Sequence, residues 1–484
     1  MISSAFLLPV ILFPILSGAL IQAFRIRERK AVRIYTGAVT LLTSVAAWLL
    51  ILRADESGCV LLKFTRDFTL KLRFDACGRF FAGIVATLWP LTVCYAFEYL
   101  EDDPRQHTFF TWFTMAYGVT LGISMSGNLF SLYIFYELLT LVTVPLVMHT
   151  GTREAIRAAR TYFGFSLGGA AFALISILYL MTGETSVESV QITRIFYFLG
   201  VLGFGVKSAM FPLHAWLPKA SVAPTPVTAL LHAVAVVKAG VFSVIRLTYF
   251  GYGTDLLKGS YVQILLLGLS AFTILYGAVR AVKEVHWKRR LAYSTVANLS
   301  YILFGVFLMT DAGLQGALLH MAFHAQIKIL AFFSAGAVLH QTGRAYIYEM
   351  DGLGRKMKVT FACFTVSAIA LTGIPPMSGF ISKWHLLTAA ASADTPFSFA
   401  GAGVILFAAL LTAVYMFTMV RRAWFPGKET EIQKNENVRE AGLFMLIPMV
   451  ILAAGILFTG LFPGTVMMHV REIAGSVLAA GGEF

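Results

Sequence analysis

The sequence has few charged residues. Asp, Glu, Lys and Arg make up 13% of its 484 residues, whereas apolar residues make up 58%; a soluble domain carries about 25% charged residues. A chain with so little charge cannot cover a water-facing surface of this size, so it is predicted to lie in lipid. No large soluble domain is expected, and any catalytic domain would have to come from another chain.

Cysteine is also scarce. Cys59, Cys77, Cys94 and Cys363 form neither a CxxC motif nor a metal-ligand spacing. Cys94 and Cys363 lie in apolar stretches and are expected to pack there. Cys59 and Cys77 lie in one loop and at its edge, and could pair if that loop is exported. With no nucleotide motif, quinone signature or metal ligands either, we expect no cofactor and no redox chemistry in this chain.

The net charge of +13 could indicate nucleic-acid binding in a soluble protein. In a membrane protein the same excess is typical of loops that stay on the cytoplasmic side. We therefore expect a lipid bilayer as the partner of this chain and no nucleic acid.

Apolar stretches of about 20 residues predict about fourteen transmembrane helices. An extended backbone would leave its amides unpaired in lipid, so the fold is predicted to be all-α and polytopic. The predicted spans are 4–24, 32–52, 77–98, 108–126, 128–148, 161–182, 193–213, 226–248, 261–281, 291–310, 315–340, 360–390, 401–421 and 441–465.

The loops predict the orientation of these spans. The first apolar stretch has no basic residue before it and a cluster, Arg25 to Arg33, after it, which is typical of a signal anchor rather than a cleaved signal. Further basic clusters follow in alternate loops, while the connections 182–192, 310–314 and 390–400 contain no Lys or Arg. This alternation predicts a multi-pass protein of the cytoplasmic (inner) membrane with both termini outside. The connection 53–76 alternates apolar and polar residues and predicts a small outside hairpin or interfacial segment.

Several ionisable residues lie inside the predicted spans. A charge at mid-bilayer costs on the order of 3 kcal/mol, so each needs a reason. A single buried lysine could reach the interface or pair structurally, but several on separate helices indicate a repeated use in proton translocation. The candidates are Glu137, Lys207, Lys238, His320, His324, Lys328 and Lys383, with His232 and His214 as secondary candidates.

Helical spacing groups three of the candidates. His320, His324 and Lys328 are four residues apart and lie on one helical face, as expected for a proton relay. For either histidine alone, a core position is about equally plausible. His232 and Lys238 are six apart and would not share a face on a regular helix, so His232 is treated as a separate candidate.

Proline interrupts two spans, at Pro212 and at Pro375–Pro376. Each interruption lies near a lysine, Lys207 or Lys383, and freed carbonyls at such a break can bind ions or water. Paired broken helices in two halves of a chain point to an inverted-repeat transporter, although a simple kink is the alternative. We also hypothesise that Glu137 and Lys207 form a switchable pair, in which movement of Glu137 lets Lys207 release its proton towards Lys238.

Five phrases closely resemble the antiporter-like, proton-conducting membrane subunits of respiratory complex I, membrane hydrogenases and Mrp-type Na+/H+ antiporters. They are YELLTL (136–141), KSAMFPLHAWLPKASVAPTPVTALLHA (207–233), LAYSTVANLSYILFG (291–305), HMAFHAQIKILAFFSAG (320–336) and GIPPMSGFISKW (373–384). The resemblance covers about residues 100 to 425.

The resemblance implies two inverted five-helix repeats with broken helices, flanked by extra helices. It implies domains at 1–107 (flanking helices with the 53–76 loop), 108–250 (first repeat), 251–425 (second, inverted repeat) and 426–484 (a flanking helix). It pairs Glu137 with Lys207, places Lys238, His320, His324 and Lys328 on the proton path, and makes Lys383 the terminal site. Some relatives have a glutamate at that last position, and Ser221-Val222 also depart from the common phrase.

We therefore expect a non-catalytic, proton-translocating subunit of a redox-driven complex, resembling NADH:quinone oxidoreductase or a membrane hydrogenase. Its partners would be other membrane subunits, including related antiporter-like chains, and hydrophilic redox subunits. A subunit of an Mrp-type Na+/H+ antiporter is the alternative, and a scaffold that has lost conduction is a third hypothesis.

Overall fold

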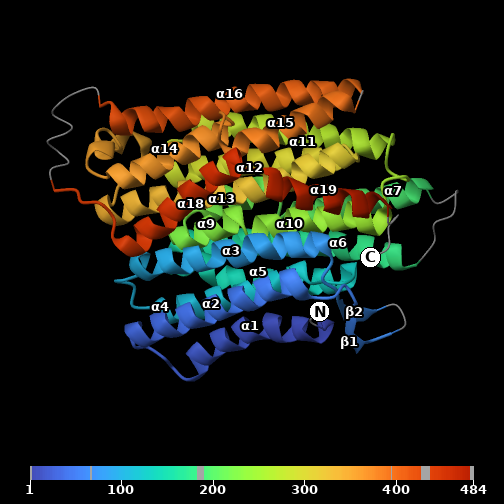
Figure 1. Cartoon of the computed structure of the whole chain (residues 1–484), viewed down its shortest axis with the longest axis horizontal. Helices are drawn as coiled ribbons and strands as arrows, with labels where there is room; N and C mark the ends of the chain where they lie inside the picture. Colours follow the sequence, from blue (N-terminus) through green and yellow to red (C-terminus); the bar gives the residue numbers. More distant parts are fainter. Residues whose placement is uncertain (1–2, 66–67, 183–189, 394, 427–436, 480–484) are drawn as a thin grey trace.

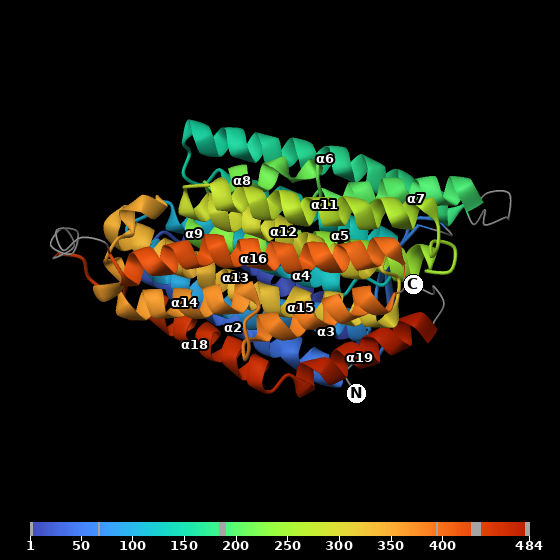
Figure 2. The same cartoon turned by 90° about the horizontal axis from the view of Figure 1, so that it is seen from above.

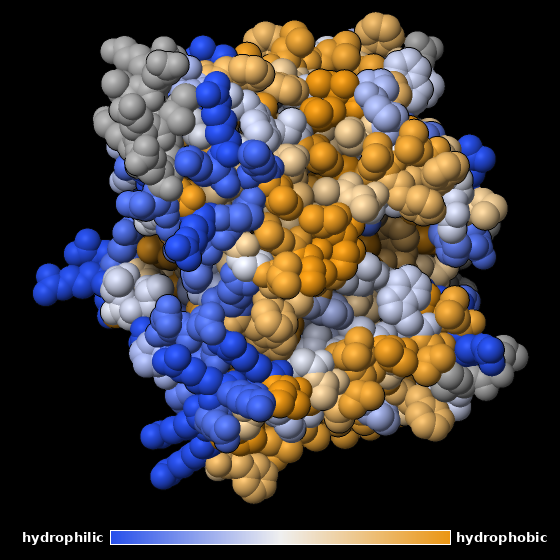
Figure 3. Space-filling model, turned by 60° about the vertical axis from the view of Figure 1, so that its left-hand side comes forward, coloured by the Kyte–Doolittle hydropathy of each residue, from blue (hydrophilic) through white to orange (hydrophobic). Residues whose placement is uncertain are grey.

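The computed structural model describes residues 3–65, 68–182, 190–393, 395–426 and 437–479. Within these ranges the chain forms a bundle of helices whose axes run along the long direction of the molecule (Figure 1). The described residues nearest to both termini lie at one end of the bundle, which we call the termini end. The Arg-rich connections between α1 and α2 and between α13 and α14 lie at the other end, which we call the basic end. Figure 3 shows hydrophilic residues gathered at one side of the surface and a hydrophobic flank beside them.

The first half of the chain contains a series of helical segments and the only two strands of the described residues. In chain order they are η1 (Ser4–Phe6), α1 (Leu7–Ala23), α2 (Arg29–Arg53), β1 (Cys59–Lys63), β2 (Thr69–Leu72), α3 (Ala76–Tyr99), α4 (Gln106–Ser124), α5 (Leu129–Val147), α6 (Arg153–Met181), α7 (Val190–Gly205), η3 (Leu213–Ala215), α8 (Trp216–Ala220) and α9 (Thr225–Ala233).

The regular elements among the described residues of the second half are all helices. It contains α10 (Val236–Ile245), η4 (Arg246–Tyr252), α11 (Tyr261–Lys283), α12 (Trp287–Phe307), α13 (Asp311–Thr342), η5 (Ile347–Glu349), η6 (Leu353–Arg355), α14 (Lys358–Thr372), α15 (Ser378–Ser392), α16 (Pro396–Trp424), α18 (Leu443–Leu461) and α19 (Gly464–Ala479).

The predicted hairpin in the 53–76 connection is confirmed. β1 and β2 are antiparallel, with Cys59 opposite Leu72 and an irregularity between Val60 and Leu62. Cys59 and Cys77 do not pair, because all four cysteines of the chain are free thiols.

Ten helices are long and apolar enough to cross a membrane within the described residues. They coincide with ten of the predicted spans, and α7 and α14 are shorter apolar helices at two more. The remaining predicted spans, 108–126 and 291–310, coincide with α4 and α12. The chain is thus a multi-pass integral membrane protein, while the count of fourteen crossings and the inverted repeats stay predictions.

The most deeply buried helices lie in the middle of the bundle. Every residue from Ala223 to Phe250 is buried, and α13 is buried along most of its length. Figure 2 shows α12 and α13 between α6 at one edge and α18 and α19 at the other. Polar groups on these central helices are therefore shielded from lipid by other helices.

The two predicted helix interruptions are confirmed. The helix that begins as α7 ends at Gly205, and the segment that follows contains both Lys207 and Pro212 before η3 begins. The predicted span 360–390 is divided into α14 and α15, with Gly373 at a φ of 91° where only glycine is relaxed.

A third interruption was not predicted. The span 226–248 was expected to be one helix, but α9 ends at Ala233 and α10 begins at Val236. Val234 and Ala235 have non-helical backbone angles, and both of their amides donate to the carbonyl of Leu230. The expectation of a regular helix over 226–248 was therefore wrong. The break could not be recognised in the sequence, because neither proline nor glycine marks it.

Candidate functional site

Lys207 and Glu137 lie together, on the segment after α7 and on α5. Lys207 is fully buried, and its Nζ lies 4.0 Å from Glu137 Oε1. The Nζ also donates a hydrogen bond to the carbonyl of Tyr136 and lies 3.3 Å from the centre of the Tyr136 ring. In the described part of the chain Glu137 Oε1 accepts no hydrogen bond. The amine of Lys207 is therefore bound by the carbonyl of Tyr136 and lies beside a carboxylate oxygen that accepts from no donor among the described residues.

Lys238 lies in the first turn of α10, directly after the unpredicted break. Its Nζ is 2.5 Å from Nδ1 of His324 on α13, and both side chains are buried. A proton can be shared between an amine and an imidazole at hydrogen-bond distance. This contact joins α10 to α13 in the middle of the bundle.

His320 continues the row along α13. Its ring lies 5.7 Å from the ring of His324, and its Nδ1 is 2.9 Å from Ser382 Oγ on α15. Its other nitrogen, Nε2, is 3.2 Å from Asn298 Oδ1 on α12. His320 thus connects the His324 end of the row to α15, which carries Lys383.

Lys383 lies in the second turn of α15, and its side chain reaches back to the end of α14. Its Nζ donates to the carbonyls of Leu371 and Thr372, at 2.6 and 3.1 Å. Because α14 ends there, these carbonyls lack their helical partners. The C-terminal end of a helix carries partial negative charge, so it holds the ammonium without a carboxylate.

Lys328, the third member of the predicted row, is also buried. Its Nζ donates to the carbonyl of Leu291 on α12, at 2.9 Å. His232 lies in contact with the same helix as Lys328, its ring 5.1 Å from that of Phe332. Neither ring nitrogen of His232 has a hydrogen-bond partner among the described residues. His232 and Lys238 were expected not to share a face on a regular helix; the helix is broken between them, and both contact α13.

His214 lies apart from these groups. Its Nε2 is 3.2 Å from the hydroxyl of Tyr276 on α11, and its ring stacks on Phe211. Pro212 and the Pro375–Pro376 pair lie in the two interruptions rather than among the polar side chains. The structure therefore brings together two sets: Glu137 with Lys207, and Lys238, His324 and His320 leading towards Lys383.

Backbone packing brings the two sets close to each other. A Cβ on Gly240 of α10 would lie 2.5 Å from the nitrogen of Ser208 and 2.8 Å from the carbonyl carbon of Lys207. Gly240 is two residues beyond Lys238. The absence of a side chain at this position lets the Lys207 segment pack directly against the helix that carries Lys238.

Three buried basic groups, Arg246, Lys288 and Arg290, were missed from the sequence. Arg246 is fully buried and pairs through both terminal nitrogens with Asp75, each at 2.5 Å. Burial raises the pKa of Asp75, but the charge and hydrogen bonds of Arg246 outweigh this, so its pKa lies below the ordinary value. Lys288 donates to the carbonyl of Ala223 at 2.7 Å and is almost fully buried. Arg246 lies in the predicted span 226–248 and could have been found there, whereas Lys288 lies in a basic loop cluster.

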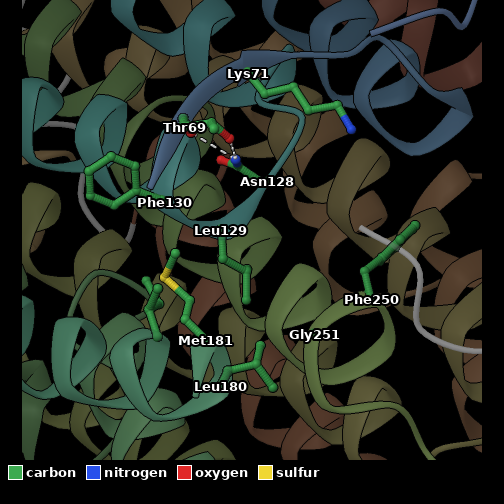
Figure 4. A pocket seen from close by; sticks show the side chains of 10 residues that line it. Thr69, Lys71, Asn128, Leu129, Phe130, Leu180, Met181, Phe250 and Gly251 are labelled. Carbon is green, nitrogen blue, oxygen red and sulfur yellow. Dashed lines mark hydrogen bonds between the residues drawn. The ribbon is translucent and has the colours of Figure 1, made fainter. Parts of the chain in front are cut away.

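The structure also has a pocket of about 460 Å³ at the termini end, between β2, α5 and η4. Asn128 lies below Thr69 and Lys71 in the upper part of Figure 4, and its Nδ2 donates to the carbonyl and the hydroxyl of Thr69. The candidate proton-translocating residues do not line it. In the described ranges, no group of three or more His, Cys, Asp and Glu side chains is placed to hold a metal ion.

Taken together, a multi-pass helical membrane protein with a row of buried amines and imidazoles along its centre defines a class of ion-transport subunits. Residues 126–412 match the family described as NADH:quinone oxidoreductase/Mrp antiporter, transmembrane. The chain therefore belongs to this family, that of the proton-antiporter-like membrane subunits, as its motifs predicted.

Relatives come from both branches of the family. The chain is 33% identical to NADH-quinone oxidoreductase subunit N of Desulforudis audaxviator over 81% of this chain and 82% of that one. It is 32% identical to an Na+/H+ antiporter subunit of Alkalihalophilus pseudofirmus, over 83% of this chain but only 53% of the longer relative. It thus spans most of the oxidoreductase relative and about half of the antiporter relative.

Solved structures share the fold. A chain of the Mrp complex from Dietzia superposes with a TM-score of 0.85 at 20% identity, covering 97% of both chains. A chain of an archaeal membrane-bound sulfane sulfur reductase gives 0.85 at 23% identity, covering 98% of this chain and 97% of that one. A chain of respiratory complex I from Thermus thermophilus gives 0.83 at 21% identity, covering 98% and 100%. These similarities extend over almost the whole chain, including the N- and C-terminal helices outside the predicted 100–425 region.

Proposed function

We propose that this chain conducts protons across the membrane as one subunit of a multisubunit, redox-driven complex. The observation that carries the proposal is the connected row from Lys238 through His324 and His320 to the α15 helix of Lys383. Buried amines and imidazoles are costly in a membrane interior unless they are used, and each member of this row can accept and release a proton. Lys328 would supply protons to the inner part of the path, and Lys383 would release protons from its outer part.

The pair of Glu137 and Lys207 would control this path. The ammonium of Lys207 is favoured while Glu137 is close, and movement of the carboxylate away would favour proton release. Since Lys207 packs against Gly240, the released proton would pass towards Lys238. Energy for the movement would come from neighbouring subunits through contacts with α5 and α6.

One observation supports a redox-driven parent complex: the relative with 33% identity that matches this chain over 82% of its own length is an oxidoreductase subunit N. Length alone does not separate the two parents, because the Mrp chain from Dietzia is also covered to 97%, at 20% identity. The proposal includes the orientation expected from the loops, with the basic end on the cytoplasmic side and both termini outside, in the cytoplasmic membrane.

The experiment has two parts. The tagged chain is isolated in mild detergent and its partners are identified by mass spectrometry; hydrophilic chains with flavin, iron–sulfur or nickel–iron centres are expected. The isolated complex is then placed in vesicles, and proton uptake on addition of the electron donor is compared with that of a Lys238→Met complex. Recovery of small membrane chains alone would support the antiporter alternative, and unchanged proton uptake in the variant would refute conduction through the row.

A further inference from the structure

A groove of about 530 Å³ lies between α2, α3, α13 and α19, away from the proton row. Its volume is within the range of about 300–1,000 Å³ typical of small-molecule sites. One wall is formed by α3 from Ala76 to Leu88, and the floor by Ala322 and Gln326, near the middle of α13. The side chains that line these walls, such as Trp48 and Ile51 on α2 and Ile84 on α3, are mostly apolar.

The groove extends through only one half of the membrane. The twelve residues between Ala76 and Leu88 cover about 18 Å of helix, close to half of a hydrocarbon core of about 30 Å. Beyond Leu88 the same side of α3 is covered by α18, where Glu98 accepts from the amide of Gly442 at 2.6 Å. The chain then turns at Phe462–Pro463, and α19 leaves the groove open beside α3.

The end of the groove nearest the termini end carries charges of both signs. Glu56 and Glu472 are its acids, and Arg79 and His469 its bases. Arg79 lies 3.8 Å from Glu56 and donates to the carbonyl of Ala54 at 2.8 Å. Arg79 and the two carboxylates give this mouth charges of both signs, which suits a headgroup with both an ammonium and a phosphate better than a purely anionic one.

We propose that this groove binds one zwitterionic phospholipid, of the phosphatidylethanolamine type, from the leaflet at the termini end. One acyl chain lies along α3 down to Ala322 and Gln326, while the phosphate faces Arg79 and the ammonium faces Glu472. A transmembrane helix of a partner protein would need a groove through the full membrane, which α18 closes. Gln326 is two residues from both His324 and Lys328, so the lipid covers the side of α13 that faces away from the proton row.

The first test places the photoreactive p-benzoylphenylalanine at Leu52, a large exposed side chain at the edge of the groove, so that the label does not fill it. The protein, isolated with its partner chains, is put in nanodiscs of equal phosphatidylethanolamine and phosphatidylglycerol, irradiated, and analysed by intact-mass spectrometry. A phosphatidylethanolamine adduct is expected. A cross-link to a partner polypeptide, or adducts in the bulk lipid ratio, would overturn the proposal.

The second test fills the groove. A Cβ on Gly83 would be 3.7 Å from Trp48, and Gly403 on the exposed face of α16 has no atom within 4 Å of its Cβ. Gly83→Phe is expected to lower phosphatidylethanolamine retained in native mass spectrometry by about tenfold, whereas the matched Gly403→Phe leaves it unchanged. Glu472→Gln, which leaves the groove walls intact, should shift retention towards phosphatidylglycerol. Equal retention in Gly83→Phe and Gly403→Phe, or an unchanged preference in Glu472→Gln, would contradict the proposal.

Discussion

The two lysines beside the helix interruptions are held in different ways. Both bind backbone carbonyls, that of Tyr136 for Lys207 and those at the end of α14 for Lys383, but only Lys207 also lies next to a carboxylate, Glu137. A carboxylate on a neighbouring helix can move away, but the carbonyls belong to the same break as the lysine. On the proposed function, this difference would let movement of another helix switch Lys207, whereas Lys383 would be a fixed end point.

The largest expected effect comes from removing either amine. Lys207→Met and Lys383→Met each interrupt the path, so donor-driven proton uptake by vesicles containing the complex is expected to fall by roughly tenfold or more, where each factor of ten is about 1.4 kcal/mol. Electron transfer measured with the vesicles made leaky to protons serves as the control. Normal proton uptake in either variant would remove that lysine from the path.

Removal of the carboxylate distinguishes the two sites. Glu137→Gln leaves Lys207 without its counter-charge and is expected to lower proton uptake severalfold, a coupling within the range of about 0.5–3 kcal/mol for residues in contact. Because the effect acts through Lys207, the double variant Glu137→Gln/Lys207→Met should be no worse than Lys207→Met. Glu137→Gln combined with Lys383→Met provides the comparison pair. If the effects of Glu137→Gln and Lys207→Met multiply, the two residues do not work as a switch.

The packing of the Lys207 segment gives a smaller effect. Gly240→Ala puts a methyl group 2.5 Å from the nitrogen of Ser208, and such overpacking costs about 1–3 kcal/mol. We expect a lower Tm and reduced proton uptake, since Lys207 must shift. Gly268→Ala on α11, whose Cβ meets no atom within 4 Å, is the matched control and should not lower the Tm. A Gly240→Ala protein with normal Tm and uptake would show that this close approach does not matter.

The sequence predicts which residues carry a charge that is costly to bury more reliably than it predicts which residues pair with one another. Glu137, Lys207 and Lys383 are found because a charge within an apolar stretch is recognisable locally. Arg246 obeys the same rule and was overlooked, and its partner Asp75 lies far from it in the sequence, just before α3. Lys288 shows the limit of the rule: in a basic loop, only the tertiary packing decides that one lysine is buried.

The fold also has features that are recognisable in the local sequence and features that depend on tertiary packing. Apolar length predicts the helices, and proline and glycine predict the interruptions near Lys207 and Lys383. The break at Val234–Ala235 contains neither proline nor glycine. It therefore depends on tertiary packing against α13 and the neighbouring helices. For that reason the contact of Lys238 with His324 could not be predicted from spacing along one helix. The helix α19 was missed because residues 464–479 are less apolar than a spanning segment.

The smallest expected effect concerns a histidine outside the bundle interior. His149 follows α5, twelve residues or about 18 Å along the chain from Glu137, and its Nε2 lies 2.9 Å from Asp103 Oδ2. Burial lowers the pKa of His149 below its ordinary value, although Asp103 opposes this. The unfolded chain therefore binds the proton more readily, and stability is lost as the pH falls below about 6.5 towards the lower pKa of the folded protein. Above that pH the stability should be constant as far as this group is concerned.

His149→Gln keeps a donor for Asp103 but cannot titrate, so its Tm should fall less than that of the wild type between about pH 7.5 and 5.5. Thermal unfolding in detergent, followed at several pH values, measures the difference. Because His149 is remote from Lys207 and Lys383, proton uptake at the upper end of that pH range should be unchanged in this variant. A parallel fall of Tm in both proteins would assign the acid sensitivity to another group, and a loss of uptake would mean that the end of α5 takes part in the movement of Glu137 away from Lys207.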